Sequence, residues 1–250
     1  MRIVSWNCGG GLRKKLERLD ALAADIVIVQ ECENPKGQEK LFNDWAGDYL
    51  WIGSNKNKGL GVFAKSGVKI ATLNWSGTFE IKGFKTKHSS HKWSTEDLEL
   101  FLPFRVNDEF NVVAVWTKNA EVFRYIGQFW KYLQIHDEDL KSSDVMIIGD
   151  FNSNTIWDKS GRWWNHSDVV AELAAMNVFS LYHHLHREEQ GKESLKTFYL
   201  HRNENKPYHI DYAFVSKVFL DRLTMEIGRK EDWLDISDHM PLIIDSNGKG

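Results

Sequence analysis

The chain of 250 residues has a formal charge of −3 at pH 7, and 42% of its residues are hydrophobic. These values are typical of a globular protein with a sizeable core, and we expect one domain over residues 1–250. They exclude a protein that coats nucleic acid by its overall charge, because such domains usually have a pI above about 9. Any contact with nucleic acid must therefore be local.

No apolar run reaches the roughly 18 residues that would span a bilayer, so we expect no insertion into a membrane. The N-terminus runs directly into strand-like sequence, RIVSWN, without the apolar core and cleavage site of a signal peptide. Cys8 and Cys32 are too few for a disulfide framework or a cysteine-based zinc site. We therefore expect a cytoplasmic protein with reduced thiols.

Apolar runs along the chain predict about a dozen strands, with three or four helices between some of them. Leu12, Leu16 and Leu19 repeat at helical spacing, a second helix covers the region 122–133, and a third covers 167–176 with Ser167 as its N-cap. The turn-rich segment 53–61 predicts a hairpin connection. The strands are predicted at 2–7, 25–30, 49–53, 60–65, 68–73, 98–106, 110–116, 145–149, 195–201, 210–216 and 240–245.

The order of these elements argues against a sheet that is parallel throughout. The strand at 2–7, the first helix and the strand at 25–30 form a short βαβ-like unit. The segment 49–116, by contrast, is a succession of strands with no helix between them. Many strands with mixed connections and few helices pack most economically as two sheets face to face, with the helices outside. We therefore predict an α/β sandwich.

Polar residues gather where the predicted strands end. Asp150 and Asn152 follow the apolar strand 145–149, and in extended chain their side chains point to one side while Phe151 points to the other. A turn is the plain alternative, because Asp and Asn commonly bond their own backbone after a strand. Strand ends that share one sheet rim are also where clefts form. The residues at such ends are Asn7, Glu31, Asp150, Asn152, Asp211, Asp238 and His239.

Five short blocks resemble one superfamily in their identity and order. They are WN at 6–7, QE at 30–31, GDFN at 149–152, HIDY at 209–212 and SDHMP at 237–241. Together they are similar to the endonuclease/exonuclease/phosphatase superfamily, and the resemblance extends over nearly the whole chain. It implies a four-layer α/β sandwich, in which two mixed β-sheets pack face to face and are flanked by helices. It also implies a metal-dependent phosphoric ester hydrolase.

The resemblance implies a metal site at two carboxylates. Glu31 corresponds to the metal-binding glutamate of the superfamily, and Asp238 is expected to contribute. Mg²⁺ is a hard cation that keeps several waters, so one or two carboxylates and the substrate oxygens suffice to hold it. We expect Mg²⁺ as the cofactor, with Mn²⁺ as a substitute. Gly9 stands where several nucleases of the superfamily carry a further ligand, so we expect one strongly bound ion.

The resemblance also implies catalytic roles. Asp150 corresponds to the residue that activates or orients the attacking water, and Asn152 to the amide that fixes the phosphate or that water. Asn7 would bond the carboxylates of the site or the phosphate. His239 would contact the phosphate, while Asp211 orients it by accepting a hydrogen bond from its other ring nitrogen.

Four further residues match the superfamily less closely. Tyr125 resembles a phosphate-contacting tyrosine, although a core or surface tyrosine is an equal alternative. Trp116 and Thr117 stand where deoxyribonuclease-like and sphingomyelinase-like members place a histidine, which argues against those two branches. His209 replaces a frequent arginine, and we expect it to face solvent rather than to contact phosphate.

Two regions suggest how a substrate is held. The segment 80–93 carries Lys85 and Lys87 among aromatic residues, which suits phosphates and bases of nucleic acid, although a solvated hairpin loop is the alternative. Trp163 and Trp164 follow GDFN and can stack on a base, a sugar or an apolar headgroup, or else cover the helix at 167–176 as core.

Phe198 and Tyr208 lie where abasic-site nucleases of the superfamily have a small apolar pocket.

From the resemblance as a whole, we predict a Mg²⁺-dependent phosphodiester hydrolase, an endo- or exonuclease that cleaves nucleic acid by in-line attack of an activated water. The alternative is a phosphatase or phosphodiesterase of a small phosphorylated molecule or lipid headgroup, which the negative charge and the Trp-rich loop favour. A binding module with an inactive site is a third hypothesis, and the complete set of seven polar residues argues against it.

Overall fold

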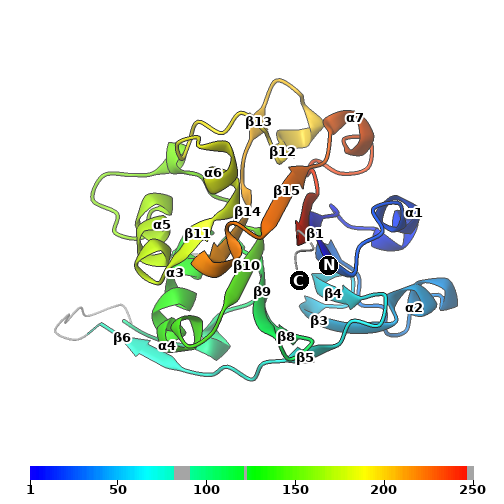
Figure 1. Ribbon diagram of the computed structural model, residues 1–250, viewed down its shortest axis with the longest axis horizontal. Coiled ribbons are helices and arrows are strands. Elements are labelled where there is room, and N and C mark those ends of the chain that lie inside the picture. Colours follow the sequence, from blue (N-terminus) through cyan, green and yellow to red (C-terminus); the bar gives the residue numbers. More distant parts are fainter. Residues whose placement is uncertain (82–90, 121–122, 247–250) are drawn as a thin grey trace.

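The computed structural model describes residues 1–81, 91–120 and 123–246. Within this part of the chain, two six-stranded mixed β-sheets pack face to face, and helices cover their outer faces (Figure 1). The apolar residues form three clusters, one between the sheets and one on each outer face. The predicted four-layer α/β sandwich is therefore confirmed.

The first sheet has the strand order β15-β16-β1-β2-β4-β3. In it β1 and β2 run parallel, and the other neighbours are antiparallel. The connection between β3 and β4 is the hairpin predicted at 53–61. The strands are β1 (Arg2–Asn7), β2 (Ile26–Cys32), β3 (Asp48–Asn55), β4 (Lys58–Ala64), β15 (Leu223–Ile227) and β16 (Leu242–Ser246).

The second sheet has the strand order β11-β14-β10-β9-β8-β5. Here β9 and β10 are the parallel neighbours, and the other pairs are antiparallel. Each sheet thus has a parallel pair near its centre, so the carboxyl ends of those two strands meet at one rim. The strands are β5 (Ile70–Thr72), β8 (Phe101–Val106), β9 (Phe110–Trp116), β10 (Val145–Asp150), β11 (Val178–Ser180) and β14 (Asp211–Ser216).

Helices cover both outer faces. The first sheet is covered by α1 (Leu16–Asp20), α2 (Lys40–Ala46) and α7 (Lys230–Trp233), and the second by α3 (Ile126–Ile135), α4 (Asp137–Lys141) and α5 (His166–Ala175). The short helix α6 (Leu181–His186) packs against β14 and β15. Two small hairpins pair β6 (Thr78–Glu80) with β7 (Lys92–Ser94), and β12 (Phe198–Tyr199) with β13 (Pro207–Tyr208).

The alternation of side chains along β1 and β10 determines which polar side chains lie between the sheets at the rim. On β1, Ile3 belongs to the core between the sheets, and on β10 Ile148 does the same while Ile147 faces the helices. Because side-chain direction repeats every two residues, Asn7 and Asp150 point into the space between the sheets. The last residues of β1 and β10 are therefore aimed at the opposite sheet.

Some predicted elements differ from the structure. Ser167 is not the N-cap of the third helix, because α5 begins at His166 and Asn165 forms a capping box with Asp168. The strand predicted at 195–201 is reduced to β12, since a 3-10 helix follows at Leu200–Arg202. The short elements α2, α4, α6, α7, β11 and β15 were not predicted, because a few residues carry little periodicity.

No helix in the described ranges is both long and apolar enough to cross a membrane.

Phe151 anchors the turn after β10, and its side chain is fully buried against Phe129 and Phe214, with ring centroids at 5.0 and 5.3 Å. Phe151→Ala is expected to lower the free energy of unfolding by about 3–5 kcal/mol, because it removes buried surface and leaves a cavity. Urea denaturation followed by circular dichroism measures this loss. Ile156→Ala, at an exposed position in the same loop, is the control and should change stability by less than about 0.5 kcal/mol. A loss below about 1 kcal/mol for Phe151→Ala would show that the turn does not depend on this side chain.

Candidate active site

A buried hydrogen bond joins the two sheets at the rim. Asn7, at the end of β1, donates from Nδ2 to Oδ2 of Asp150 at 2.9 Å, and both side chains are buried. Asp150 also accepts from the backbone N–H of Asn152 at 2.8 Å and from its Nδ2 at 2.9 Å. Asp150 is thus held by three donors from two sides, which fixes the direction of its carboxylate.

Asp211 and His239 complete the buried centre. Asp211 is paired with Asp150 in the β10–β14 register, and its Oδ2 lies 2.9 Å from Nδ1 of His239. Nε2 of His239 lies 3.9 Å from Oδ2 of Asp150, which is too long for a hydrogen bond. One ligand atom from each of these three residues lies within 4.8 Å of the others. His239 is therefore hydrogen-bonded to Asp211, while its second ring nitrogen lies near Asp150 without a hydrogen bond to it.

The pKa values of Asp150 and His239 are both raised, but by different causes. Burial raises the pKa of Asp150 to about 7, and the charge of Asp211 adds to the shift, while His239 opposes it. Burial alone lowers the pKa of His239, but the charges of Asp211 and Asp150 outweigh burial and raise the pKa to about 9. Near neutral pH the centre therefore holds an imidazolium beside a carboxylate that is poised to exchange a proton.

Backbone contacts fix the loop that carries His239. The hydroxyl of Ser237 donates to the carbonyl of Asn7 at 2.7 Å and accepts from the N–H of His239 at 3.1 Å. Nε1 of Trp6 donates to the carbonyl of His239 at 2.9 Å. The ring of Phe198 packs on the imidazole, with centroids 4.5 Å apart. The loop before β16 is therefore tied to the end of β1 by contacts that do not titrate.

The two predicted metal ligands lie beside this centre. Glu31 follows Gln30, the register partner of Asn7, and its carboxylate pairs with Nζ of Lys58 at 2.8 Å. Asp238 directs Oδ1 toward Gly9, where an added Cβ would lie 3.8 Å away. Carboxylate oxygens are the donors that Mg²⁺ prefers, so the chemistry of these residues fits such an ion. The assignment of Glu31 and Asp238 as ligands stays a prediction.

A cleft of about 760 Å³ opens next to the buried centre. It shares Asn152 with the centre, and Phe198 contributes one ring both to the cleft and to the packing on His239. The remaining side chains are largely aromatic or cationic. The lining residues are Arg124, Tyr125, Ile126, Asn152, Ser153, Trp157, Lys159, Arg162, Trp164, Phe198, Leu200, Tyr208 and Ile210.

Predicted substrate residues fall into three groups. Phe198, Tyr208 and Trp164 line the cleft, and so does Tyr125, which is 37% exposed. Trp163 does not line it: this ring is 49% exposed and packs edge-on against Trp130 at 4.8 Å. Lys85 and Lys87 lie outside the described residues. Arg124 and Lys159 were not predicted, because single cations beside loops carry no sequence pattern.

A second buried polar network supports the loop after β10 from behind. Nδ2 of Asn154 donates to both carboxylate oxygens of Glu193 at 3.1 Å, and Glu193 also contacts Nε2 of His183 at 3.2 Å. Burial alone raises the pKa of Glu193, but hydrogen bonds from His183 and the Gly191 N–H outweigh it and lower the pKa to about 2. Glu193 is therefore ionised, and it holds the loop that begins with Asp150.

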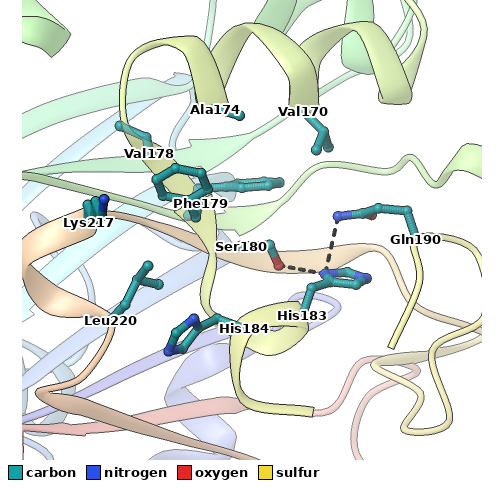
Figure 2. Close-up of a pocket in the computed structure, with 11 residues that line it drawn as sticks. Val170, Ala174, Val178, Phe179, Ser180, His183, His184, Gln190, Lys217 and Leu220 are labelled. Carbon is teal, nitrogen blue, oxygen red and sulfur yellow. Dashed lines mark hydrogen bonds between the residues drawn. The ribbon is translucent and has the colours of Figure 1, made fainter. Parts of the chain in front are cut away.

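His183 also borders a separate, mostly apolar cavity of about 440 Å³ between α5, β11 and α6 (Figure 2). Its Nδ1 lies 2.7 Å from Oγ of Ser180 and 3.2 Å from Nε2 of Gln190. The Gln190 amide can only donate, so Nδ1 is the acceptor and Nε2 carries the proton toward Glu193. The tautomer of His183 is thus set by the side chains that line this cavity.

His209 does not face solvent, and this prediction was wrong. The side chain is 1% exposed, and Nδ1 contacts the carbonyl of Leu195 at 2.9 Å. Burial lowers the pKa of His209 to about 4, and it does the same for His166. The sequence does not reveal this burial, because it depends on helix α6, whose Tyr182 ring covers the His209 ring with centroids 4.5 Å apart.

Comparison with known proteins agrees with this architecture. A family model described as the Endonuclease/Exonuclease/phosphatase family matches residues 4–239. No match is found among curated protein sequences.

Solved structures share the fold. A 3′ phosphatase from Neisseria, NExo, bound to a product DNA hairpin, has a TM-score of 0.68 and 15% identity, and the match covers 98% of this chain and 99% of that chain. A 3′-5′ exonuclease structure of NExo from Neisseria meningitidis has a TM-score of 0.67 and 16% identity, over 99% and 100% of the two chains. An AP endonuclease from Archaeoglobus fulgidus has a TM-score of 0.65 and 16% identity, over 99% of each chain.

The buried neutral His209 makes stability depend on pH. Its pKa is about 4 in the folded state and about 6.5 when unfolded, so the unfolded chain binds more protons between these values, and the free energy of unfolding falls as pH is lowered through that window. His209→Asn keeps a donor for the Leu195 carbonyl and should reduce the loss between pH 7 and pH 4 by about 2–3 kcal/mol. Urea denaturation at a series of pH values measures it. The exposed His201, changed to Asn, is the control, and equal pH dependence in both variants would contradict the assignment.

Proposed function

Because the chain belongs to the endonuclease/exonuclease/phosphatase family, we propose that it is a divalent-metal-dependent phosphodiesterase that hydrolyses nucleic acid. The observation that carries this proposal is the buried set Asn7, Asp150, Asp211 and His239 directly beside a cleft lined with rings and cations. In-line hydrolysis of a phosphate ester needs a positioned water, a base, and positive charge around the phosphate. These residues can provide each of them.

Asp150 is proposed as the base that takes a proton from the attacking water. A base works best when its pKa lies close to the working pH, and burial raises the pKa of Asp150 to about 7. The amides of Asn7 and Asn152 hold one carboxylate oxygen, which leaves the group fixed in direction rather than free to rotate. Asn152 lines the cleft as well, so we assign it contact with the phosphate or with the water.

His239 is proposed as the cationic donor to the phosphate. Asp211 accepts from Nδ1, which fixes the ring and favours its protonated form. Nε2 is then available to donate to a phosphate oxygen placed between His239 and Asp150. Because neither carboxylate is exposed, this charge acts in a medium of low dielectric, where it stabilises an anion more strongly than in water.

Glu31 and Asp238 are proposed to hold a Mg²⁺ ion, with Mn²⁺ as a substitute. Both carboxylates are half-buried at the same rim as Asn7. When bound, the ion supplies positive charge for the phosphate oxygens on which negative charge develops. Because Gly9 has no Cβ, no side chain at this position lies against Oδ1 of Asp238.

The cleft favours nucleic acid as substrate. Trp157 is 42% exposed and offers a ring on which a base can stack, and Arg162 lies over the Trp164 ring at 4.6 Å. Arg124 and Lys159 add exposed charge for backbone phosphates. The overall charge of −3 agrees with a contact that is confined to this side of the molecule.

A phosphatase or phosphodiesterase of a small phosphorylated molecule or lipid headgroup is the second candidate. It is favoured by the limited size of the cleft, about 760 Å³, and by the negative overall charge. A phosphomonoester at the end of a nucleic acid would satisfy both proposals.

We also propose that residues 1–250 act as one domain and that the protein works in the cytoplasm, where the unpaired Cys8 and Cys32 stay reduced.

The first test is hydrolysis, with Mg²⁺ and with a chelator, of single-stranded, duplex and abasic DNA, of RNA, of bis(p-nitrophenyl) phosphate and of inositol phosphates. Cleavage of a polymer that stops on chelation is the expected result. Activity confined to small esters would replace the first candidate by the second. Absence of any hydrolysis would contradict both.

Asp150→Asn is expected to lower the turnover rate by about 100- to 10,000-fold, because the amide cannot accept the proton of the water. The fold should be retained, since the amide has nearly the shape of the carboxylate. Asp144→Asn changes an exposed aspartate just before the same strand, and it is expected to keep full activity. A near-normal rate for Asp150→Asn would remove this residue from the mechanism.

Arg124→Gln tests whether the cleft follows a charged polymer. If Arg124 contacts a phosphate, the slope of log affinity against log salt concentration should fall by about 0.7–0.9. Fluorescence anisotropy with a labelled oligonucleotide measures the slope. Arg222→Gln, an exposed arginine beyond the far end of β14, should leave it unchanged. Equal slopes for wild type and Arg124→Gln would argue for a small substrate.

A further inference from the structure

Lys58 forms an ion pair with Glu31, the carboxylate that we propose as a metal ligand. Its Nζ lies 2.8 Å from Oε2 of Glu31, and the side chains are 50% and 21% exposed. Surface ion pairs of this kind contribute little to stability, because water and salt screen them. The contact is therefore specific in geometry but weak enough to be exchanged for a doubly charged ion.

The local backbone is built to present Glu31 to this position. The register between β2 and β4 shifts between Gln30 and Cys32, so Glu31 is the extra residue of a β-bulge. Its φ of 62° lies in the left-handed region, which a residue with a side chain rarely adopts. Bulges beside active sites redirect a side chain, and this one turns Glu31 toward the first residue of β4, which is Lys58.

Lys58 also reaches the second sheet. Its Nζ lies 5.7 Å from the centroid of the Trp116 ring, and Trp116 is the register partner of Asp150. Lys118 lies over the same ring at 4.9 Å. Lys58 therefore lies between Glu31 on the first sheet and Trp116 on the second, and Trp116 is next to Asp150, the proposed base. Two ammonium groups thus lie over one ring next to Asp150, and each has a carboxylate partner: Glu31 for Lys58, and the exposed Glu99 for Lys118 at 3.9 Å.

We propose that Lys58 exchanges partners when the metal binds: it neutralises Glu31 in the metal-free protein, and once the ion takes Glu31 it binds, with Lys118, a phosphate of the substrate beside Trp116. This inference rests on the proposed function, since it uses Glu31 as a ligand and a phosphate ester as substrate. It adds a phosphate-binding site between Lys58 of the first sheet and Lys118 after β9 of the second, and neither lysine lines the aromatic cleft. Metal and substrate binding are coupled as a result, because each ion that binds releases one lysine.

The physical reason for the coupling is charge. A divalent ion and an ammonium group repel each other when both approach Glu31, so Lys58 lowers the affinity for the ion. The free ammonium group then lies near two positive neighbours, the ion and Lys118, and an anionic phosphate relieves this repulsion. The substrate thus replaces Glu31 as the partner of Lys58.

Mn²⁺ binding, measured by electron paramagnetic resonance on the full chain without substrate, tests the exchange. Lys58→Met keeps the length of the side chain and removes its charge, and it is expected to tighten Mn²⁺ binding by about three- to tenfold. In a Glu31→Gln background the same change should have less than about a twofold effect, because the contested carboxylate is gone. Lys56→Met, an exposed lysine in the same hairpin, controls for the general loss of charge.

The second arm measures binding of a labelled single-stranded DNA oligonucleotide in an Asp150→Asn background, which prevents cleavage. Lys58→Met should weaken binding by about three- to tenfold when Mg²⁺ is saturating, and it should have no effect in the presence of a chelator. Unchanged Mn²⁺ affinity for Lys58→Met, or an equal loss of DNA affinity with and without Mg²⁺, would overturn the exchange.

The two proposals fail in different ways. If Glu31→Gln leaves Mn²⁺ binding unchanged, the metal assignment of the proposed function falls, and the Lys58 exchange falls with it. If Glu31→Gln weakens Mn²⁺ binding while Lys58→Met does not tighten it, only the exchange is overturned. Circular dichroism and thermal unfolding of each variant establish that these differences do not arise from loss of the fold.

Discussion

The hydrogen bond from Asn7 to Asp150 is the contact on which the site depends, because it connects the two sheets at the rim where the site lies. Each sheet has a parallel pair of strands, and parallel strands end at the same edge. The two edges then meet because the sheets pack face to face. A buried carboxylate without donors would cost several kcal/mol, so the amide of Asn7 makes the burial of Asp150 possible. The buried centre therefore forms only when the two sheets pack together.

The electrostatics of the centre follow from one cation shared between two buried carboxylates. His239 is bonded to Asp211 and lies 3.9 Å from Asp150, so its charge neutralises the first more completely than the second. Burial raises the pKa of Asp150 because the charge of His239 opposes this effect only in part, while Asp211 is the hydrogen-bonded partner of the imidazolium. Two residues of the same type on neighbouring strands therefore have different environments, which is how one site can hold a base and an orienting group.

Much of the fold and of the buried centre could be predicted from sequence. The period-two alternation of β1 and β10 is strong, and it directs Asn7 and Asp150 toward each other. The N-cap at Ser167 was misplaced because Asn165 and Asp168 form a reciprocal pair that a single-residue preference does not weigh. Trp163 and Trp164 are adjacent in sequence, yet only Trp164 lines the cleft, because neighbouring side chains in a turn point in different directions.

Other features have no sequence pattern at all. The histidines that support the loop after β10 come from separate elements, and their burial depends on how α5 and α6 pack. The left-handed conformation of Glu31 depends on a register shift between two strands, which no local motif records. Sequence therefore predicts the polar residues of the buried centre better than the residues that hold them, because the former lie at the ends of strong strands and the latter lie in loops.

Trp116 stands where the resemblance leads us to expect a histidine in deoxyribonuclease-like members, and the two side chains differ in what they offer a substrate. An imidazole there would offer a titrating cation, whereas the indole of Trp116 is nearly buried and offers a face to ammonium groups. The positive charge on this side comes from Lys58 and Lys118 instead. A lysine keeps its charge at pH values where an imidazole loses it, but its long stem lets it change partners. Under the proposed exchange, phosphate binding on this rim depends on the cation that competes with Lys58 for Glu31, so the metal ion rather than the proton would regulate it.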